Sequence, residues 1–183
     1  MQMDFRKGHR VVHPAHGAGT ITDIRDIGIG EMQCTYLVIE TSEKELMVPE
    51  GQAKAVGLRP VASPERASEL LALCEQPPTE QEIIGVLRRS LSGPGAFYAK
   101  SAELVARTLR VLRTLSVTRT LGAGNRRLYK RSIELLANEL ALASGQDLQE
   151  ARVDIELRLA NMASQFRSAL GHHRLSQAAA TSY

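Results

Sequence analysis

Residues 34–39, with the sequence CTYLVI, decide the fold of the first third of the chain. Their side chains are apolar or β-branched, which is typical of a central β-strand. Gly, Pro and Asp punctuate similar short runs on either side, so we expect strands at residues 11–12, 20–27, 33–40 and 45–48. Several short strands before residue 60 predict a small, strongly bent, barrel-like sheet.

After Pro60 the pattern becomes helical. Ser63-Pro64-Glu65 is a typical helix start, with Ser as the N-cap, Pro at the first position and an acid in the first turn. Pro77-Pro78 ends that helix, and breaks at later Gly, Pro and Ser residues predict helices at residues 80–92, 96–115, 123–142 and 148–170. The predicted fold class is α+β: a β domain at residues 1–60, an all-α domain of about five helices at residues 61–170, and a flexible tail at residues 171–183.

The net charge of +3 is distributed very unevenly. Residues 85–131 hold eleven Lys or Arg and one acid, Glu103, a net charge of +10, whereas residues 61–84 carry a net charge of −4. A concentrated basic block is typical of proteins that bind a polyanion such as nucleic acid. The alternative is a solvated face, or ion pairs between this block and the acidic segment at residues 61–84.

Several other classes of protein are not indicated. Cys34 and Cys74 form no CxxC pair and suggest no disulfide framework. The opening residues MQMDFRKGHR contain no apolar signal region, and no apolar run reaches the length of about eighteen residues that a membrane span needs. We therefore expect a cytoplasmic protein with no membrane partner.

Catalytic and metal sites are not indicated either. His9, His13, His16 and Cys34 could be imagined as metal ligands, but they include no tight Cys pair and lie on no common helical face. Two Gly-x-Gly fragments lack the rest of a phosphate-binding loop. We expect no metal, no cofactor and no enzymatic activity.

Residues 8–21, GHRVVHPAHGAGTI, resemble the opening of the CarD/CdnL family of bacterial RNA-polymerase-binding transcription regulators. Members begin with a Gly, an apolar pair, an aromatic-Pro step and then His/Gln-Gly-x-Gly, although His13 stands here where Tyr is common. Further matches follow in order at residues 36–39 (YLVI), 48–49 (VP), 56–59 (VGLR), 122–128 (GAGNRRL) and 139–143 (ELALA). The resemblance spans residues 3–165.

This resemblance implies that the two domains bind different partners. The N-terminal domain would be a Tudor-like barrel, shared with transcription-repair coupling factors, that binds the RNA polymerase β subunit through a sheet edge. The C-terminal helical domain would contact promoter DNA near the upstream edge of the transcription bubble and stabilise the open complex.

The chain departs from the family pattern at two positions. The family's Trp, which wedges into the minor groove at the bubble edge, is matched by Val86, and the chain contains no Trp. The basic pair after it is present as Arg88-Arg89. Some members carry an Arg just before the Val-Pro step, where this chain has Met47.

Two sets of candidate contact residues follow. For polymerase binding by strand addition at residues 20–27 or 33–48, we expect side-chain contacts from Arg25, Asp26, Glu45 and Met47, with an edge that is merely exposed as the alternative. For DNA, Val86 and Leu87 are candidate wedges, as are Phe97 and Tyr98, with core packing as the alternative. Phosphate contacts are expected from the basic residues Arg88, Arg89, Arg107, Arg110, Arg113, Arg126, Arg127, Lys130 and Arg131.

The resulting prediction is a monomeric transcription regulator that binds the polymerase β subunit and modulates open-complex stability at promoter DNA. Its location would be the nucleoid, through RNA polymerase. The alternatives are a stand-alone, non-sequence-specific DNA-binding protein and an adaptor whose helices bind an acidic protein partner.

Overall fold

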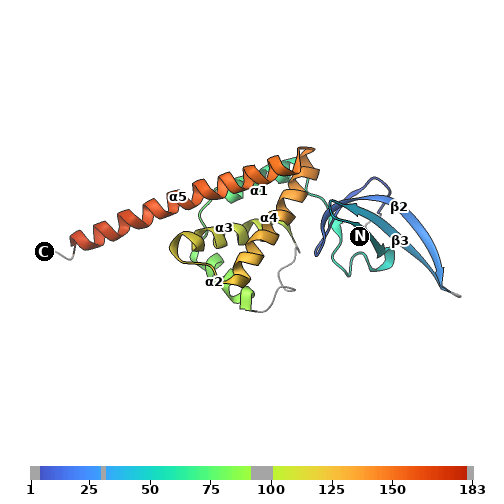
Figure 1. Ribbon diagram of the computed structural model, residues 1–183, viewed down its shortest axis with the longest axis horizontal. Coiled ribbons are helices and arrows are strands. Elements are labelled where there is room, and N and C mark those ends of the chain that lie inside the picture. The colour runs from blue at the N-terminus through green and yellow to red at the C-terminus, as the bar shows by residue number, and fades with distance from the viewer. Residues whose placement is uncertain (1–4, 30–31, 92–100, 181–183) are drawn as a thin grey trace.

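The computed structural model describes residues 5–29, 32–91 and 101–180, and it consists of an antiparallel β domain followed by five helices (Figure 1). The sheet lies at one end of the molecule, and the last helix runs past the others to the opposite end. The predicted α+β class, with a β domain before an all-α domain, is therefore confirmed. None of the helices in these described ranges is long and apolar enough to cross a membrane.

The sheet has the strand order β4-β3-β2-β1-β5 and is antiparallel throughout. All four predicted strands are present, and the five bounds are β1 (Arg10–His13), β2 (Gly17–Ile29), β3 (Met32–Thr41), β4 (Glu45–Pro49) and β5 (Arg59–Pro60). The sheet is open, not a closed barrel, because β4 and β5 form its two edges. A two-residue β5 that leads directly into the first helix is too short to pair along β4.

The two central strands are bent and unusually long. Their register shifts between Ile21 and Asp23, a β-bulge that increases the local twist. At Gly19 an added Cβ would lie only 2.4 Å from the backbone oxygen of Glu40, so only glycine fits this crossing. Beyond Arg25 and its partner Tyr36, where pairing with β4 ends, β2 and β3 continue as a two-stranded arm that projects past the rest of the sheet (Figure 1).

The concave side of the sheet holds the core of the β domain. This core is built from buried apolar side chains of every part of the domain: Phe5, Val11, Ile21, Leu37, Ile39, Val48, Ala53 and Leu58. Ala53 and Leu58 come from the segment after the 3-10 turn η1 (Glu50–Gln52), which folds back beneath the strands. The domain thus closes its core with a loop, where a barrel would use further strand pairing.

The helices begin at the residues that capping chemistry indicates. Ser63 accepts a hydrogen bond from the Arg66 N–H (3.2 Å) and caps α1 (Pro64–Cys74). Thr79 and Glu82 form a reciprocal capping box at the start of α2 (Glu80–Leu91), with bonds of 2.8 and 3.3 Å. Both predicted starts are confirmed.

The later helices differ from prediction at their ends. Ser101 caps α3 (Ala102–Thr118), and the predicted start at residue 96 lies outside the described residues. Gly145, with φ of 72°, ends α4 (Ala123–Ser144) in the left-handed conformation that favours glycine. α5 runs from Leu148 to Ala180, so the predicted helix end at residue 170 was wrong. Flexibility of residues 171–183 stays a prediction.

α3 is the central helix of the α domain and packs against α1, α2, α4 and α5. Its side chains enter two apolar clusters. The larger joins α1, α3, α4 and α5 around Leu109, Leu136, Leu140 and Ile155. The smaller, which we call the distal cluster, joins the last turns of α2 and α3 to the first turns of α4 around Val86, Val111, Leu112 and Leu115.

Leu109 tests the importance of the larger cluster. Leu109→Ala should lower the free energy of unfolding by about 2–5 kcal/mol, because a fully buried leucine leaves a cavity when it is truncated. Leu157→Ala is the control, since Leu157 is 57% exposed and its truncation should cost about 0.5 kcal/mol or less. Urea unfolding measures both, and equal destabilisation by the two substitutions would contradict this account of the core.

Candidate functional site

Three of the four residues proposed for polymerase contact share one face of the sheet. The register pairs Arg25 with Tyr36, and Val38 with Met47. Because side chains alternate along a strand, Arg25, Glu45 and Met47 all lie on the face that Val38 occupies. The Arg25 guanidinium lies 3.0 Å from Asp23 and 4.0 Å from Glu45. Val38 itself is fully buried and does not belong to the main core of the β domain.

Asp26 is separated from this set. It is adjacent to Arg25 in a strand, so its side chain lies on the opposite face, where it accepts a hydrogen bond of 2.7 Å from the Thr35 hydroxyl. The hydrogen bond from Arg25 holds the pKa of the neighbouring Asp23 below its usual value. The outer face therefore carries a small charged group, Asp23–Arg25–Glu45, beside an exposed methionine.

β4 is a free edge of the sheet within the described residues. The Thr41 N–H donates to the Lys44 oxygen at 3.0 Å, and hydrogen-bonded and non-hydrogen-bonded pairs alternate along an antiparallel ladder. Counting along β4, Met47 is a non-hydrogen-bonded partner of Val38, so its N–H and C=O point away from β3. Pro49 occupies the next outward position, where the missing N–H costs no ladder bond. With Met47 43% exposed, this edge can accept another strand.

Two of the predicted DNA-binding arginines are engaged inside the protein. Arg107 and Arg110 on α3 both donate to the same Glu82 oxygen on α2. Arg107 also pairs with Glu103 at 2.8 Å, and Arg110 donates to the Gln76 carbonyl at 3.0 Å. Arg110 is only 3% exposed. Arg107 and Arg110 therefore pair with the acidic segment at residues 61–84, which was the alternative to phosphate contact.

Glu82 holds this cluster together. Burial raises the pKa of its carboxyl, but the Thr79 N–H and the two arginines outweigh burial and leave the pKa below the ordinary value of 4.5. Glu82 is thus ionised at neutral pH, caps α2 and ties α2 to α3. The sequence signal for its capping role was present in Thr79-x-x-Glu82. The uneven charge of the sequence indicated that this acidic segment could pair with the basic block, but not which arginines would contact Glu82.

The two candidate wedge residues belong to the distal cluster. Val86 is 0% exposed and packs with Val111 and Leu112, and Leu87 is partly buried against the same cluster. This packing matches the core alternative, and a fully buried Val86 cannot enter a DNA groove unless α2 moves. Phe97 and Tyr98 lie outside the described residues, as does the side chain of Arg89.

Basic residues surround the distal cluster, and all of them are exposed except the partly buried Arg113. Within the described part of the chain, these residues make no ion pair: Arg88, Arg113, Arg119, Arg126, Arg127 and Lys130. They lie on the ends of α2 and α3 and on the first turns of α4, around one end of the α domain, which we call the basic end. Arg126 donates to the Leu121 carbonyl at 2.6 Å. Arg119 was not among the predicted contacts.

The start of α4 reinforces the positive character of the basic end. Its N-cap is Gly122, which makes no side-chain cap hydrogen bond, and its first turn contains no acid. No Asp or Glu occurs between Glu103 and Glu134 in the sequence. Free N–H groups and the positive end of the helix dipole add to the arginine charges there. Arg131, by contrast, faces the β domain and donates to the Ala15 carbonyl at 2.6 Å.

The histidines and cysteines do not assemble into a metal site among the described residues. The rings of His13 and His16 lie 4.7 Å apart, and burial together with neighbouring positive charge lowers the pKa of both. Cys34 and Cys74 are free thiols. Burial raises the pKa of the Cys74 thiol to about 12, so this thiol is unreactive.

A comparison with known families identifies the β domain. Residues 5–62 match the family model of the CarD-like/TRCF RID domain, and these limits coincide with the sheet, its core and the strand that leads into α1. The β domain is therefore similar to RNA-polymerase-interacting domains of this type. The match covers the β domain alone and is consistent with the resemblance to the CarD/CdnL family. The α domain lies outside the matched residues.

The contribution of Glu82 to stability can be tested by measuring the free energy of unfolding as a function of pH. Because the pKa of Glu82 is lowered on folding, its stabilisation is complete above pH 4.5 and is lost as the pH falls through the folded-state pKa. Glu82→Gln should lower the free energy of unfolding at pH 7 by about 1–3 kcal/mol, since it leaves the buried Arg110 without a carboxylate partner. It should also flatten the fall in stability below pH 4.5.

The matched control is Glu156→Gln, which removes an exposed i,i+4 partner of Arg152. It should cost about 0.5 kcal/mol or less. Denaturant unfolding between pH 3 and pH 7 measures both variants. A Glu82→Gln variant with the wild-type pH profile would show that this carboxylate does not hold α2 and α3 together.

Proposed function

We propose that this chain is a transcription regulator that binds the β subunit of RNA polymerase through β4 and contacts promoter DNA through the basic end. It would act as a monomer at the nucleoid and modulate the stability of the open complex near the edge of the bubble. The observation that carries the proposal is the CarD-like/TRCF RID match over a domain whose β4 edge is exposed.

Strand addition explains how the β domain would recognise polymerase without a dedicated side-chain pocket. Main-chain N–H and C=O groups supply affinity, and side chains beside the edge supply specificity. Met47 offers outward backbone groups and an exposed, adaptable thioether. The Asp23–Arg25–Glu45 group beside it offers charges of both signs. The missing family Arg at position 47 would be offset by Arg25 on the same face.

The DNA contact would be made mainly through phosphates. The basic end carries six cations without an ion pair, five of them exposed, whereas Arg107 and Arg110 are already paired with Glu82. Phosphate contacts position a protein on DNA but do not read its sequence. With Val86 in the core, we expect weaker stabilisation of the bubble than in relatives with a Trp wedge.

The edge of β4 is tested with Met47→Pro. Proline removes an N–H that points away from β3, so the ladder to β3 stays intact while an added strand finds no donor at this position. Binding to the isolated polymerase β lobe should weaken about tenfold, as measured by calorimetry. Met47→Leu keeps the N–H and the apolar character and should bind like the wild type.

The outcomes separate the candidate functions. Equal binding by the proline and leucine variants, with thermal unfolding unchanged, would show that β4 is not the contact. A wild-type chain that binds DNA but not the β lobe would instead favour the stand-alone DNA-binding protein.

The basic end is tested by the salt dependence of DNA binding. If about five of its cations contact phosphate, the slope of log K against log salt should be roughly −4 to −5 for duplex DNA. Arg127→Ala/Lys130→Ala should make that slope shallower by about 1.8, because each cation on a phosphate contributes roughly 0.9 to it. Fluorescence anisotropy over a series of salt concentrations measures the slope.

The charge-matched control is Arg152→Ala/Arg167→Ala, which removes two exposed cations from α5. Its slope should equal that of the wild type. Slopes that become equally shallow in both double variants would show that binding responds to net charge alone, and wild-type slopes in both would show that Arg127 and Lys130 do not contact phosphate. Polymerase binding without any DNA binding would favour the adaptor.

A further inference from the structure

Contacts between the two domains converge on one stripe of α4. The residues involved recur every three or four positions, which places them on a single helical face: Arg131, Leu135, Asn138, Glu139 and Leu142. α4 is also the helix of the α domain that packs most closely on β2. The β domain therefore packs against a single helix, α4.

Glu139 is the central contact of this stripe. Its carboxylate is 2% exposed and receives both arms of the Arg59 guanidinium, at 2.6 and 2.7 Å. The Ala62 N–H donates to the same carboxylate at 3.2 Å. Arg59 lies in β5 and Ala62 in the linker, so one buried acid fixes both the edge of the sheet and the chain that leaves it. Bidentate pairing adds geometric specificity to the energy of the contact.

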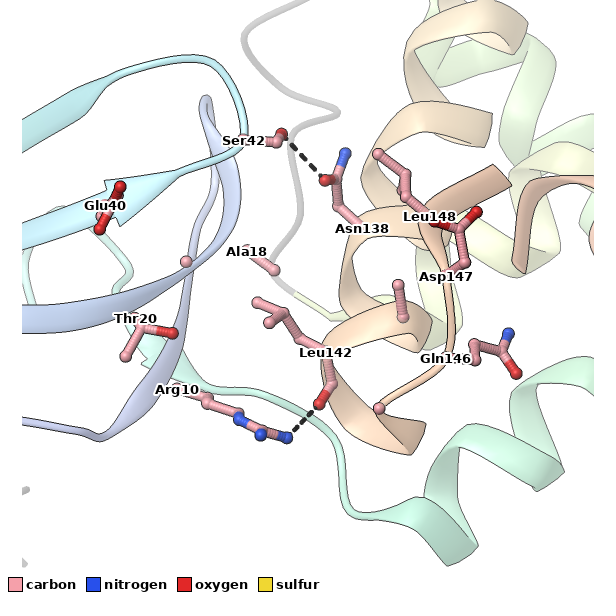
Figure 2. Close-up of a pocket in the computed structure, with 13 residues that line it drawn as sticks. Arg10, Ala18, Thr20, Glu40, Ser42, Asn138, Leu142, Gln146, Asp147 and Leu148 are labelled. Atoms are coloured by element: carbon pink, nitrogen blue, oxygen red, sulfur yellow. Dashed lines mark hydrogen bonds between the residues drawn. The ribbon is translucent and has the colours of Figure 1, made fainter. Parts of the chain in front are cut away.

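Polar contacts on both sides of Glu139 limit rotation of the β domain relative to α4. The Ser42 hydroxyl lies 3.0 Å from the Asn138 side chain, and Arg10 donates to the Leu142 carbonyl at 2.5 Å. Figure 2 shows both bonds across a groove of about 450 Å³ whose walls belong to different domains. Nearer the start of α4, Arg131 reaches the Ala15 carbonyl and lies 3.7 Å from Glu43. Contacts at both ends of the stripe oppose rotation about the Arg59–Glu139 pair.

The same helix carries part of the basic end. Lys130 and Glu139 are separated by nine residues of continuous helix, about 14 Å at 1.5 Å per residue. A helix does not bend freely over that length. The position of β4 relative to Arg127 and Lys130 is therefore determined by how the β domain sits on α4.

We propose that the Arg59–Glu139 pair is an orientation lock, which holds the polymerase-binding edge and the DNA-binding end in one fixed relation so that both engage a polymerase–promoter complex together. This rests on the proposed function. If only about one molecule in ten kept the binding orientation, the apparent affinity for the two-site target would fall about tenfold. The affinity for either site alone would not change, because each surface stays intact.

The first experiment measures the orientation itself. Spin labels at the native Cys34, which is exposed, and at Ser168→Cys on α5 report the distance between the domains, while the buried Cys74 does not react. The full chain should give a narrow distance distribution, and Glu139→Ala a broad one. Glu139→Gln provides a milder variant if the alanine variant does not fold, and Glu156→Ala is the exposed control.

The second experiment measures binding of the same variants. Glu139→Ala should bind a polymerase–promoter complex about tenfold more weakly, yet bind the isolated β lobe and duplex DNA like the wild type. A short thiol cross-linker joining Ser42→Cys to Asn138→Cys, in a Cys34→Ser background, should restore the affinity of the Glu139→Ala chain. That rescue would not occur if Glu139 contributed only to local stability.

Two results would overturn the lock. A narrow distance distribution in Glu139→Ala and Glu139→Gln would show that this pair does not set the orientation. A broad distribution with full affinity for the polymerase–promoter complex would show that orientation does not matter for binding. If the wild-type chain binds no polymerase, the proposed function fails, but the distance measurement still decides whether the pair fixes the domains.

Discussion

The buried carboxylate of Glu139 is the constraint on which the rest of the arrangement depends. Leaving such a charge unpaired costs on the order of several kcal/mol, so its environment must supply matching donors. Arg59 and the Ala62 N–H do so, and both belong to the segment that joins the domains. The connection between sheet and helices is therefore set by electrostatics as well as by the length of the linker. Because α4 contacts the β domain and also carries part of the basic end and of the α-domain core, it fixes the positions of all three relative to one another.

A second acid, Glu82, determines which arginines remain available to a partner. The sequence concentrates positive charge between residues 85 and 131, but that charge divides into two groups in the folded chain. Arg107 and Arg110 are paired with Glu82 near the middle of α3, where they join it to α2. The cations without an ion pair lie around the distal cluster. Charge that stabilises the fold and charge that can bind DNA thus come from one stretch of sequence.

Local physics made much of the fold predictable. The strands and the starts of α1 and α2 depend on β-branched runs and on capping residues within a few positions, and all of these were found. Predictions that depended on distant residues fared less well. The open sheet follows from the short β5, and α5 continues through residues 171–180 despite their polar composition.

The candidate sites show the same division. Arg25, Glu45 and Met47 could be placed near one edge from strand pattern and family resemblance, and register brings them onto one face. The positions of Val86 in the core and of Arg110 against Glu82 could not be predicted, since an apolar or basic residue on a helix has the same local signal whether it faces solvent or a neighbouring helix. Arg59 and Glu139 are eighty residues apart, and no local pattern links them.

The central claim, that the β domain recognises RNA polymerase through β4, is tested most directly by amide hydrogen exchange on the full chain with and without the polymerase β subunit. The account predicts that residues 45–49, and the outward Met47 N–H above all, exchange more slowly in the complex, while the β1 and β5 side of the sheet is unchanged. Binding without protection of β4, or protection confined to another edge, would contradict it.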